Sequence, residues 1–451
     1  MVTPAGADAT ERPTRPPAAR SALLTYGTSL AVAALSLLNV LIVARSLGPD
    51  GRGQVVFLTT IALLTAAISA LSVQQGIVNV ASADPGSRRA LATNAVVLAL
   101  VLGAIGIACV ALLIEVFPAV GSGASRSLTW LALASIPVLI LATYLQLLIQ
   151  ADYGFAFTNV VLLVSPAVNV AVNGALAAAG ALTVGAALGT WIGGQLLALA
   201  LLVWYVGRRG QGFGAPDLPL ARHSLTFGAK SHVGSVMALG NYRLDQWLLG
   251  SIAGARELGL YSVAVAWSEA LFFLPTALAA VQRPDLVRGS RQEAGDSAAL
   301  IFRVAVIVTL PLCVAMILLA PFLCVTIFGE DFRGSIDDLR VLVPGALGIV
   351  AMKLMANALT ARNLPGLAST AIGVAFVVTI VLDIILIPDH GGLGAAIAST
   401  VAYLTAGAVA AVFAARALGV EGRAFLPRRG DVGWLWGHAK LLLHGVRSRF
   451  A

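Results

Sequence analysis

The sequence predicts an all-α polytopic membrane protein with about twelve transmembrane helices in two six-helix lobes. Composition is the first of three observations behind this prediction. Hydrophobic residues make up 59% of the 451 residues and charged residues only 11%, whereas a soluble domain has about 25% charged residues. A chain with a mean hydropathy of +0.91 has too little polar surface to cover a water-soluble fold.

A series of long apolar stretches is the second observation. A membrane-spanning helix needs about 20 apolar residues, and stretches of at least that length follow one another along the chain, bounded by charged residues, Gly or Pro. The short connections leave no room for a large catalytic domain outside the membrane. We expect spans at residues 21–46, 54–81, 90–117, 127–150, 154–180, 182–206, 223–250, 259–282, 301–328, 341–361, 364–388 and 391–416.

An internal repeat is the third observation. The glycines of SLGPDGRG (46–53) recur 206 residues later in IAGARELG (252–259), and a Gly-Ala-Ala sequence at 185–187 recurs 209 residues later at 394–396. Two matches at nearly one offset indicate a six-helix unit that occurs twice. Because both halves begin on the same side, the repeats are parallel, an arrangement that places a transporter's substrate site between the two lobes.

The expected domain organisation follows from these spans and from the charged segments between them. We predict a disordered cytoplasmic tail at 1–20, a first lobe at 21–206, a cytoplasmic linker at 207–222, a second lobe at 223–416 and a basic tail at 417–451. In the last segment, aromatic and aliphatic residues such as Trp434 and Trp436 alternate with Arg and Lys. That pattern is typical of a helix lying on an anionic membrane surface, and a loosely ordered basic tail is an equal alternative.

The distribution of Lys and Arg predicts the orientation. The segments on the side of the N-terminus hold twenty of the 29 Lys and Arg residues and the opposite side holds six. Cytoplasmic segments carry such an excess of positive charge. We therefore expect both termini inside, in a bacterial plasma membrane. The three cysteines all lie in apolar stretches, which predicts packing residues and no disulfide framework.

Several segments resemble a known family. Residues 44–53 (ARSLGPDGRG), 243–246 (RLDQ), 257–262 (ELGLYS) and 392–398 (GLGAAIA) are similar to patterns of the polysaccharide biosynthesis, or Wzx-like oligosaccharide flippase, family. That family belongs to the multidrug, oligosaccharidyl-lipid and polysaccharide exporter superfamily. The resemblance implies a V-shaped, two-lobed transporter that moves a lipid-linked saccharide across the membrane.

Cationic residues inside or beside the spans are the candidate substrate-binding residues. A charge within a span is energetically expensive and marks a functional hypothesis. A polyprenyl-pyrophosphate-linked sugar needs cations that replace the water and counterions around its diphosphate. The candidates are Lys230, Arg243 and Lys353 in the second lobe, with Arg45 and Arg52 at the outer edge of the first two spans.

Three carboxylates in the second lobe form a separate group of candidates. Asp245, Glu269 and Asp383 lie within spans and either couple transport to an ion or neutralise the cations in structural pairs. Pro275 is expected to kink the helix that carries Glu269. No metal site, catalytic residue or cofactor is predicted, and coupling to a proton or sodium gradient stays open.

These residues favour a flippase that works by alternating access on a lipid-linked oligosaccharide or polysaccharide precursor. Its partners would be that lipid, the surrounding membrane lipids and other polysaccharide-assembly enzymes, and no nucleic acid. The first alternative is a multidrug or cation extruder, which is disfavoured because the first two spans contain no Asp or Glu. The second is a membrane polymerase or glycosyltransferase, which is disfavoured because the largest charged loop on the outer side has only about a dozen residues, 329–340.

Overall fold

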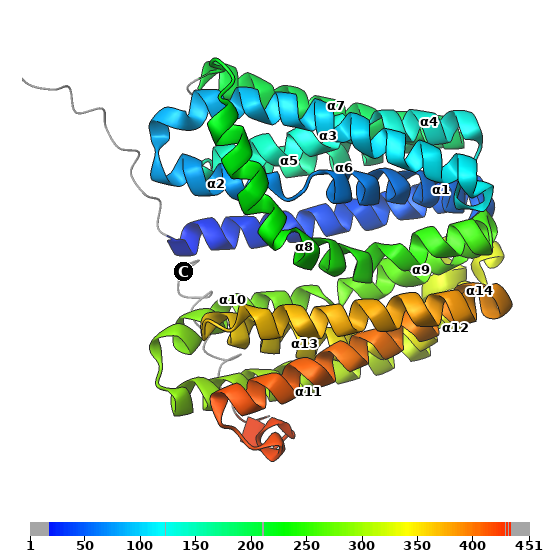
Figure 1. The fold of residues 1–451 in the computed structure, drawn as a ribbon. Helices are drawn as coiled ribbons and strands as arrows, with labels where there is room; N and C mark the ends of the chain where they lie inside the picture. The colour runs from blue at the N-terminus through cyan, green and yellow to red at the C-terminus, as the bar shows by residue number, and fades with distance from the viewer. Residues whose placement is uncertain (1–17, 122, 210–211, 429, 432, 434–451) are drawn as a thin grey trace, which may run out of the picture.

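The protein folds into two helical lobes, shown in Figure 1 with the first lobe in blue to cyan and the second in green to orange. The computed structural model describes residues 18–433 except 122, 210–211, 429 and 432. Every regular element in this part of the chain is helical. The predicted all-α membrane fold is therefore confirmed.

The first lobe is built from seven helices. Its long helix α1 passes through the middle of the molecule (Figure 1), where within this lobe it packs most extensively on α6 and also contacts α3, α4, α5 and α7. The bounds are α1 Ala18–Ser69, α2 Val73–Ala83, α3 Arg88–Val116, α4 Arg126–Ala134, α5 Ile136–Ala151, α6 Phe155–Ala178 and α7 Val184–Arg208.

The second lobe also has seven helices. It ends in the longest helix, α14, which packs along α13 and α8. The bounds are α8 Leu218–Ile252, α9 Ala255–Ala270, α10 Phe273–Arg288, α11 Arg291–Pro321, α12 Ser335–Leu342, α13 Gly345–Ala361 and α14 Pro365–Leu418, with a π-helical turn at Phe322–Thr326 after α11.

The helices account for the twelve predicted spans. Eight helical segments of the described chain are long and apolar enough to cross a membrane. Two of them, α1 and α14, hold two spans each, because Gly48 and Gly391 interrupt them with non-helical backbone angles. The charged helix α8 and the pair α9–α10 supply the remaining two.

Some expected boundaries are displaced. Residues 18–20, predicted as part of a disordered tail, already belong to α1. The predicted linker at 207–222 is shorter, because α7 continues to Arg208 and α8 begins at Leu218. The helix that carries Glu269 is broken at Leu271–Phe272, close to the predicted kink at Pro275. Proline has no N–H and its ring clashes with the carbonyl four residues earlier, here that of Leu271.

The two lobes meet through equivalent residues of the repeat. Gly48 and Gly254 have nearly the same backbone angles, φ 66° with ψ −175° and φ 89° with ψ 179°. A Cβ on Gly53 would lie 1.6 Å from the carbonyl oxygen of Ala255, and one on Gly259 would lie 1.9 Å from that of Pro49. The repeat relates these two contacts to each other, because Gly259 is the counterpart of Gly53 and Ala255 is the counterpart of Pro49. The three-dimensional structure therefore confirms the internal duplication.

The opposite ends of the molecule differ. The Gly48 end, which contains the connections at Gly48 and Gly254, is closed by this glycine contact and by the Asp50–Arg256 ion pair at 3.2 Å. At the Ser87 end, which contains the start of α1 and the Ser87 connection, α10 packs against α11 and α13 of its own lobe. The first half of α1 has no buried residue from Leu24 to Ile42. The lobes thus diverge toward the Ser87 end and form a V.

One contact between the lobes persists on the Ser87 side. A Cβ on Gly76 of α2 would lie 2.5 Å from the Cα of Ser224, and one on Gly228 would lie 2.6 Å from the carbonyl oxygens of Leu71 and Ser72. Small residues allow backbones in membranes to approach this closely. Helix α8 therefore bridges the lobes, with its first half on α2 and its second half on α14.

The start of the C-terminal segment is held against α11. Arg303 donates through Nε to Asp431 Oδ2 at 2.8 Å and through Nη2 to Oδ1 at 3.0 Å, and its Nη1 donates to the carbonyl of Ala424 at 2.7 Å. Trp434, Trp436 and the basic residues that follow lie outside the described residues, as do residues 1–17. The predicted interfacial helix stays a prediction.

Candidate functional site

An ion pair between Arg243 of α8 and Glu269 of α9 forms the centre of the site. The guanidinium donates to both carboxylate oxygens, at 2.7 Å and 3.3 Å. About one third of each side chain is exposed, 30% and 32%. The sequence left open whether Glu269 pairs with a cation; the structure pairs it with Arg243. Because the pair is only part-buried, its outer faces stay accessible to a ligand.

Lys353 of α13 lies on the second-lobe side of this pair. Its Nζ donates to Thr276 Oγ1 at 3.0 Å and to the carbonyl of Phe272 at 3.3 Å, and it lies 5.7 Å from the centroid of the Phe272 ring. Phe272 lies at the break between α9 and α10, so the break positions both acceptors. All of these hydrogen-bond partners are neutral, and the negative charge that acts on Lys353 is that of Glu269.

Arg52 of α1 lies on the first-lobe side. Its Nε donates to Ser262 Oγ of α9 at 3.2 Å. Arg52 interacts electrostatically with Arg243, and Lys353 does so with Glu269. Arg52, Arg243, Glu269 and Lys353 therefore form a group across the lobe interface, which we call the central charge row. Its three cations and one carboxylate have a net charge of +2.

A cavity flanks the row in each lobe. The second-lobe cavity has a volume of about 360 Å³ and is lined by Lys353, Tyr242, Thr276 and apolar residues of α8, α13 and α14. The first-lobe cavity has a volume of about 380 Å³ and is lined by Arg52, by amide and hydroxyl side chains and by apolar residues. Both are of the size found for small-molecule sites, and each contains one cation of the row.

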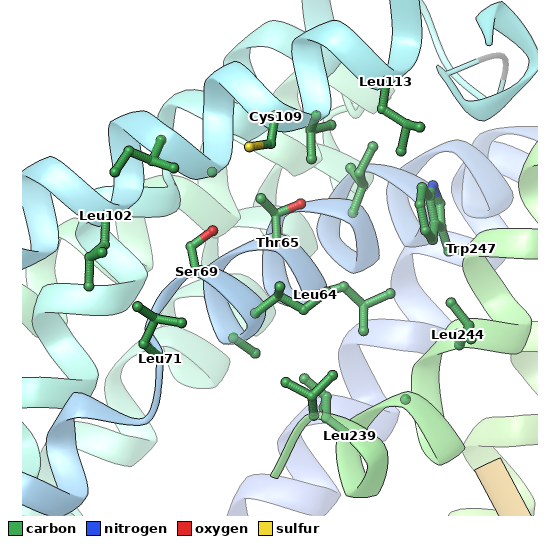
Figure 2. Close-up of a pocket in the computed structure, with 18 of the residues that line it drawn as sticks. Leu64, Thr65, Ser69, Leu71, Leu102, Cys109, Leu113, Leu239, Leu244 and Trp247 are labelled. Atoms are coloured by element: carbon green, nitrogen blue, oxygen red, sulfur yellow. The ribbon is translucent and has the colours of Figure 1, made fainter. Parts of the chain in front are cut away.

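A third cavity, of about 370 Å³, is apolar. Figure 2 shows Leu64 and Leu71 facing Leu102, Cys109 and Leu113, with Trp247 at one end. These residues come from α1, α3 and α8, except Leu71, which lies in the turn between α1 and α2. Of the described residues that line this cavity none is charged, and only Thr65 and Ser69 add hydroxyl groups. The cavity suits a hydrocarbon chain and excludes a diphosphate or a sugar, which it could not solvate.

Two of the predicted cations lie away from the row. Arg45 donates to the carbonyls of Ile327 and Thr326 at 2.7 Å and 3.0 Å, where the helix that continues α11 ends. These hydrogen bonds of Arg45 connect the two lobes at the Gly48 end. Lys230 is exposed on α8, in the half of that helix toward the Ser87 end. Of the five candidate cations, the row contains Arg52, Arg243 and Lys353, and Arg45 and Lys230 lie outside it.

Asp245 is inside the second lobe. Its Oδ2 accepts hydrogen bonds from Tyr261 at 2.5 Å and Ser399 at 3.1 Å, and its Oδ1 accepts one from the backbone of Gln246 at 2.8 Å. Only 2% of the residue is exposed. The sequence placed Arg243 and Asp245 on different helix faces without deciding which one faces the lobe interior; the structure buries the aspartate.

Asp383 of α14 is completely buried and electrostatically coupled to Asp245. Neither of its carboxylate oxygens has a hydrogen-bond partner among the described residues. A buried carboxylate without a partner is expensive as an anion.

The residues that the sequence did not assign to the site are the amides of the first lobe. Asn169 and Asn173 of α6 line the first-lobe cavity, one helical turn apart. Their four-residue spacing is a signal for a shared polar helix face, but many helices of the first lobe carry amides, so spacing alone does not select these two.

This geometry defines a class of protein: a two-lobed helical membrane protein with a polar site between its lobes. Solved structures have the same fold. An inward-facing multidrug resistance MATE family transporter is 12% identical, with a TM-score of 0.71 over 88% of this chain and 98% of its own. The lipid II flippase MurJ in an inward closed conformation is 14% identical, with a TM-score of 0.72 over 89% of each chain.

An outward-facing MATE family transporter superposes less well, with a TM-score of 0.58 at 14% identity over 88% of this chain and 94% of its own. No curated protein matches the chain in sequence.

The family follows from the sequence itself. The profile of the polysaccharide biosynthesis protein family matches residues 42–337, which is more than half of the chain. The protein belongs to this family, and the resemblance found in its motifs is confirmed.

Proposed function

We propose that the protein is a flippase, not an enzyme, that moves a polyprenyl-pyrophosphate-linked saccharide across the plasma membrane. The observation that carries the proposal is the central charge row. A diphosphate joined to a lipid at one end and to a sugar at the other carries two negative charges, and the row has a net charge of +2. Arg binds phosphate in a bidentate manner and Lys binds it as a point charge.

The two kinds of cavity support the same substrate class. A lipid-linked saccharide has a hydrocarbon tail and a strongly polar head. The apolar cavity and the exposed apolar surfaces of α1, α3 and α8 suit the tail, and the two cavities beside the row suit the head. The tail would stay in contact with lipid while the head crosses between the lobes.

The V shape supports alternating access. With the termini in the cytoplasm, as the charge distribution predicts, the Ser87 end faces inward and the structure is an inward-facing state. The reverse state would require the contacts at Gly53, Gly259 and Arg45 to separate. A reporter fused after Arg428, such as alkaline phosphatase, tests the orientation: it should be inactive there and active after Ala124, and the opposite pattern contradicts it.

We further propose that Asp245 and Asp383 couple transport to an ion. The buried and unpartnered carboxylate of Asp383 beside Asp245 supports this assignment. Glu269, the third predicted carboxylate, has Arg243 as its partner and acts in the charge row.

A multidrug or cation extruder is the second candidate, because a MATE family transporter has the same fold. A cationic substrate needs carboxylates, yet the described lining of the first-lobe cavity contains none, and its single charged residue is Arg52. A cation would be repelled there. The row therefore favours an anionic substrate, and we place the extruder second.

Lipid analysis in a deletion strain tests the proposal. Loss of the protein should raise the amount of undecaprenyl-linked sugars in the inner leaflet, and the wild-type gene should reverse this. Arg243→Ala and Lys353→Ala should reduce the rescue at least about tenfold, because a charge-assisted hydrogen bond contributes about 1.5–3 kcal/mol. Glu269→Gln should weaken release or positioning of the head group without abolishing binding.

Arg126→Ala is the control, since Arg126 is exposed and pairs only with Glu115 at 3.4 Å. It should rescue fully. Unchanged lipid-linked sugars in the deletion strain, together with a lower tolerance of cationic dyes, would contradict the flippase and favour the extruder.

A further inference from the structure

The first-lobe cavity is distinguished by its amide lining. Its wall contains Asn39, Gln146, Asn169, Asn173, Gln195 and Trp191, and Arg52 is the one charged residue among those described. An amide both donates and accepts hydrogen bonds, as a sugar hydroxyl does. Such a wall matches a neutral ligand rich in hydroxyl groups better than it matches an ion.

Two of these amides have a side-chain oxygen without a hydrogen-bond partner among the described residues. Asn173 is 1% exposed and donates through Nδ2 to Asn39 Oδ1 at 2.8 Å, while its own Oδ1 has no partner in the described part of the chain. The Oδ1 of Asn169, a residue that is 8% exposed, also has none. Buried polar atoms are nearly always hydrogen-bonded. Both oxygens lie just beneath the cavity surface and out of contact with solvent in this state, so a ligand would supply the missing donors once the two amide side chains turn toward it.

The position and size of the cavity further limit the kinds of ligand that it can bind. It begins at Arg52, which is a member of the central charge row, so its occupant lies beside the diphosphate. A volume of about 380 Å³ equals that of roughly a dozen water molecules, which accommodates a pyranose ring. The half-buried Trp191 adds a flat apolar surface of the kind that packs against one face of a sugar ring.

We infer that the first-lobe cavity binds the saccharide unit nearest the diphosphate, with Asn169 and Asn173 accepting hydrogen bonds from its hydroxyl groups. This inference rests on the proposed function, because the diphosphate at the row positions the sugar. The lobes then have different tasks: the second lobe contributes Arg243 and Lys353 to the diphosphate, with Glu269 orienting Arg243, and the first lobe recognises the sugar.

Calorimetric titration of the full-length protein in nanodiscs separates the two tasks. The probes are farnesyl methyl diphosphate, which lacks a sugar, and the farnesyl diphosphate diesters of glucose, galactose and N-acetylglucosamine. All four carry the same charge. At least one sugar diester should bind about tenfold more tightly than the methyl diester, since each neutral hydrogen bond is worth roughly two- to tenfold in affinity.

Asn169→Leu and Asn173→Leu should each remove most of that gain and leave the affinity for the methyl diester unchanged. Asn79→Leu, at an exposed amide of α2, is the matched control and should change neither affinity. If the buried variants fail to fold, Gln146→Met and Gln195→Met at the less buried amides carry the same expectation.

The outcomes distinguish the inference from the proposed function. Equal affinity of the wild type for all four probes would overturn the saccharide site and leave the diphosphate site intact. A loss of methyl diester binding in the asparagine variants would also overturn it, because the amides would then act only on the fold. Failure of the wild type to bind any probe would overturn the proposed function and the inference together.

Discussion

Single residues of α8 show how closely opposite environments can lie in this protein. Arg243 and Asp245 are two positions apart, which on an α-helix is a rotation of about 200°. The arginine faces the space between the lobes and pairs with Glu269, while the aspartate is buried against Tyr261 and Ser399. Helical geometry predicted that they face different ways. Which one is buried depends on α14, which covers the aspartate side.

Asp383→Asn tests whether the buried carboxylates bind an ion. The wild type in detergent should melt at a higher temperature when the ion that neutralises Asp383 is supplied, either as Na⁺ or as protons, because a ligand of the native state stabilises it by about 2.7 kcal/mol at a hundredfold excess over Kd. The variant should lose this dependence, and its transport should stop. Thermal melts in NaCl and in choline chloride, at several pH values, measure the effect.

Glu115→Gln is the matched control, because Glu115 is an exposed carboxylate at the Gly48 end. Its melting temperature should respond to Na⁺ and pH as that of the wild type does. Equal melting of the wild type in all the salts and pH values would assign Asp245 and Asp383 a purely structural role.

At the scale of elements, breaks within the helices position the polar groups of the site and turn the chain. The break between α9 and α10 presents the Phe272 carbonyl and Thr276 to Lys353, and Gly48 and Gly391 turn α1 and α14 at positive φ. The sequence predicted the Pro275 kink from the chemistry of proline. It did not predict that the kink would provide the partners of Lys353, because those are brought together by the packing of α10 on α13.

The contact between α11 and the C-terminal segment gives the next prediction. Asp431→Asn removes the carboxylate that Arg303 binds, and breaking a buried ion pair costs about 3–5 kcal/mol when one charge is left without its partner. The segment after α14 should then be cleaved by trypsin at least about tenfold faster, with the first cut at Arg423 or Arg428. Cleavage at the same rate as in the wild type would contradict the anchor. Asp337→Asn, at an exposed pair with Arg340, serves as the comparison.

The same ion pair predicts a pH dependence. The hydrogen bonds from the Arg303 side chain hold the pKa of Asp431 below its usual range. A lowered pKa means that the stabilisation is present at neutral pH and is lost only as the pH falls through that lowered value, below about 4. Proteolysis by an acid-tolerant protease should therefore show a firmly held segment at pH 5 and a detached one only in stronger acid.

For the whole molecule, the contact at the Gly48 end determines the conformation. Gly53 and Gly259 occupy equivalent places in the two repeats, and each abuts the other lobe's backbone. A side chain there cannot be accommodated by moving the end of a flexible neighbour, because the atoms it meets are main-chain carbonyl oxygens. The end can then close only if both positions lack a Cβ.

Gly259→Ala should therefore shift the protein away from the state that is closed at the Gly48 end. Spin labels on cysteines at Ser127 and Asp337, in a background without Cys109, Cys313 and Cys324, measure the separation of the lobes at the Gly48 end. The variant should show longer distances than the wild type, and transport should fall because one half of the cycle is blocked. Gly189→Ala is the control, since a Cβ at Gly189 meets no atom within 4 Å. Unchanged distances in Gly259→Ala would contradict the closing role.

The sequence by itself determined the class of fold, the number of spans, the two-fold repeat and the charged residues that are candidates for the site. These properties follow from local rules. The length of a hydrophobic stretch decides whether it crosses a membrane, and a charge inside a span is so costly that it marks a functional candidate. Only the tertiary structure decided which charges meet. It joined Arg243 to Glu269, separated Arg45 and Lys230 from the row, buried Asp245 beside Asp383 and collected Asn169 and Asn173 around a cavity with Arg52. Such groups come from helices far apart in the chain, so their proximity depends on packing between elements, which no local pattern encodes.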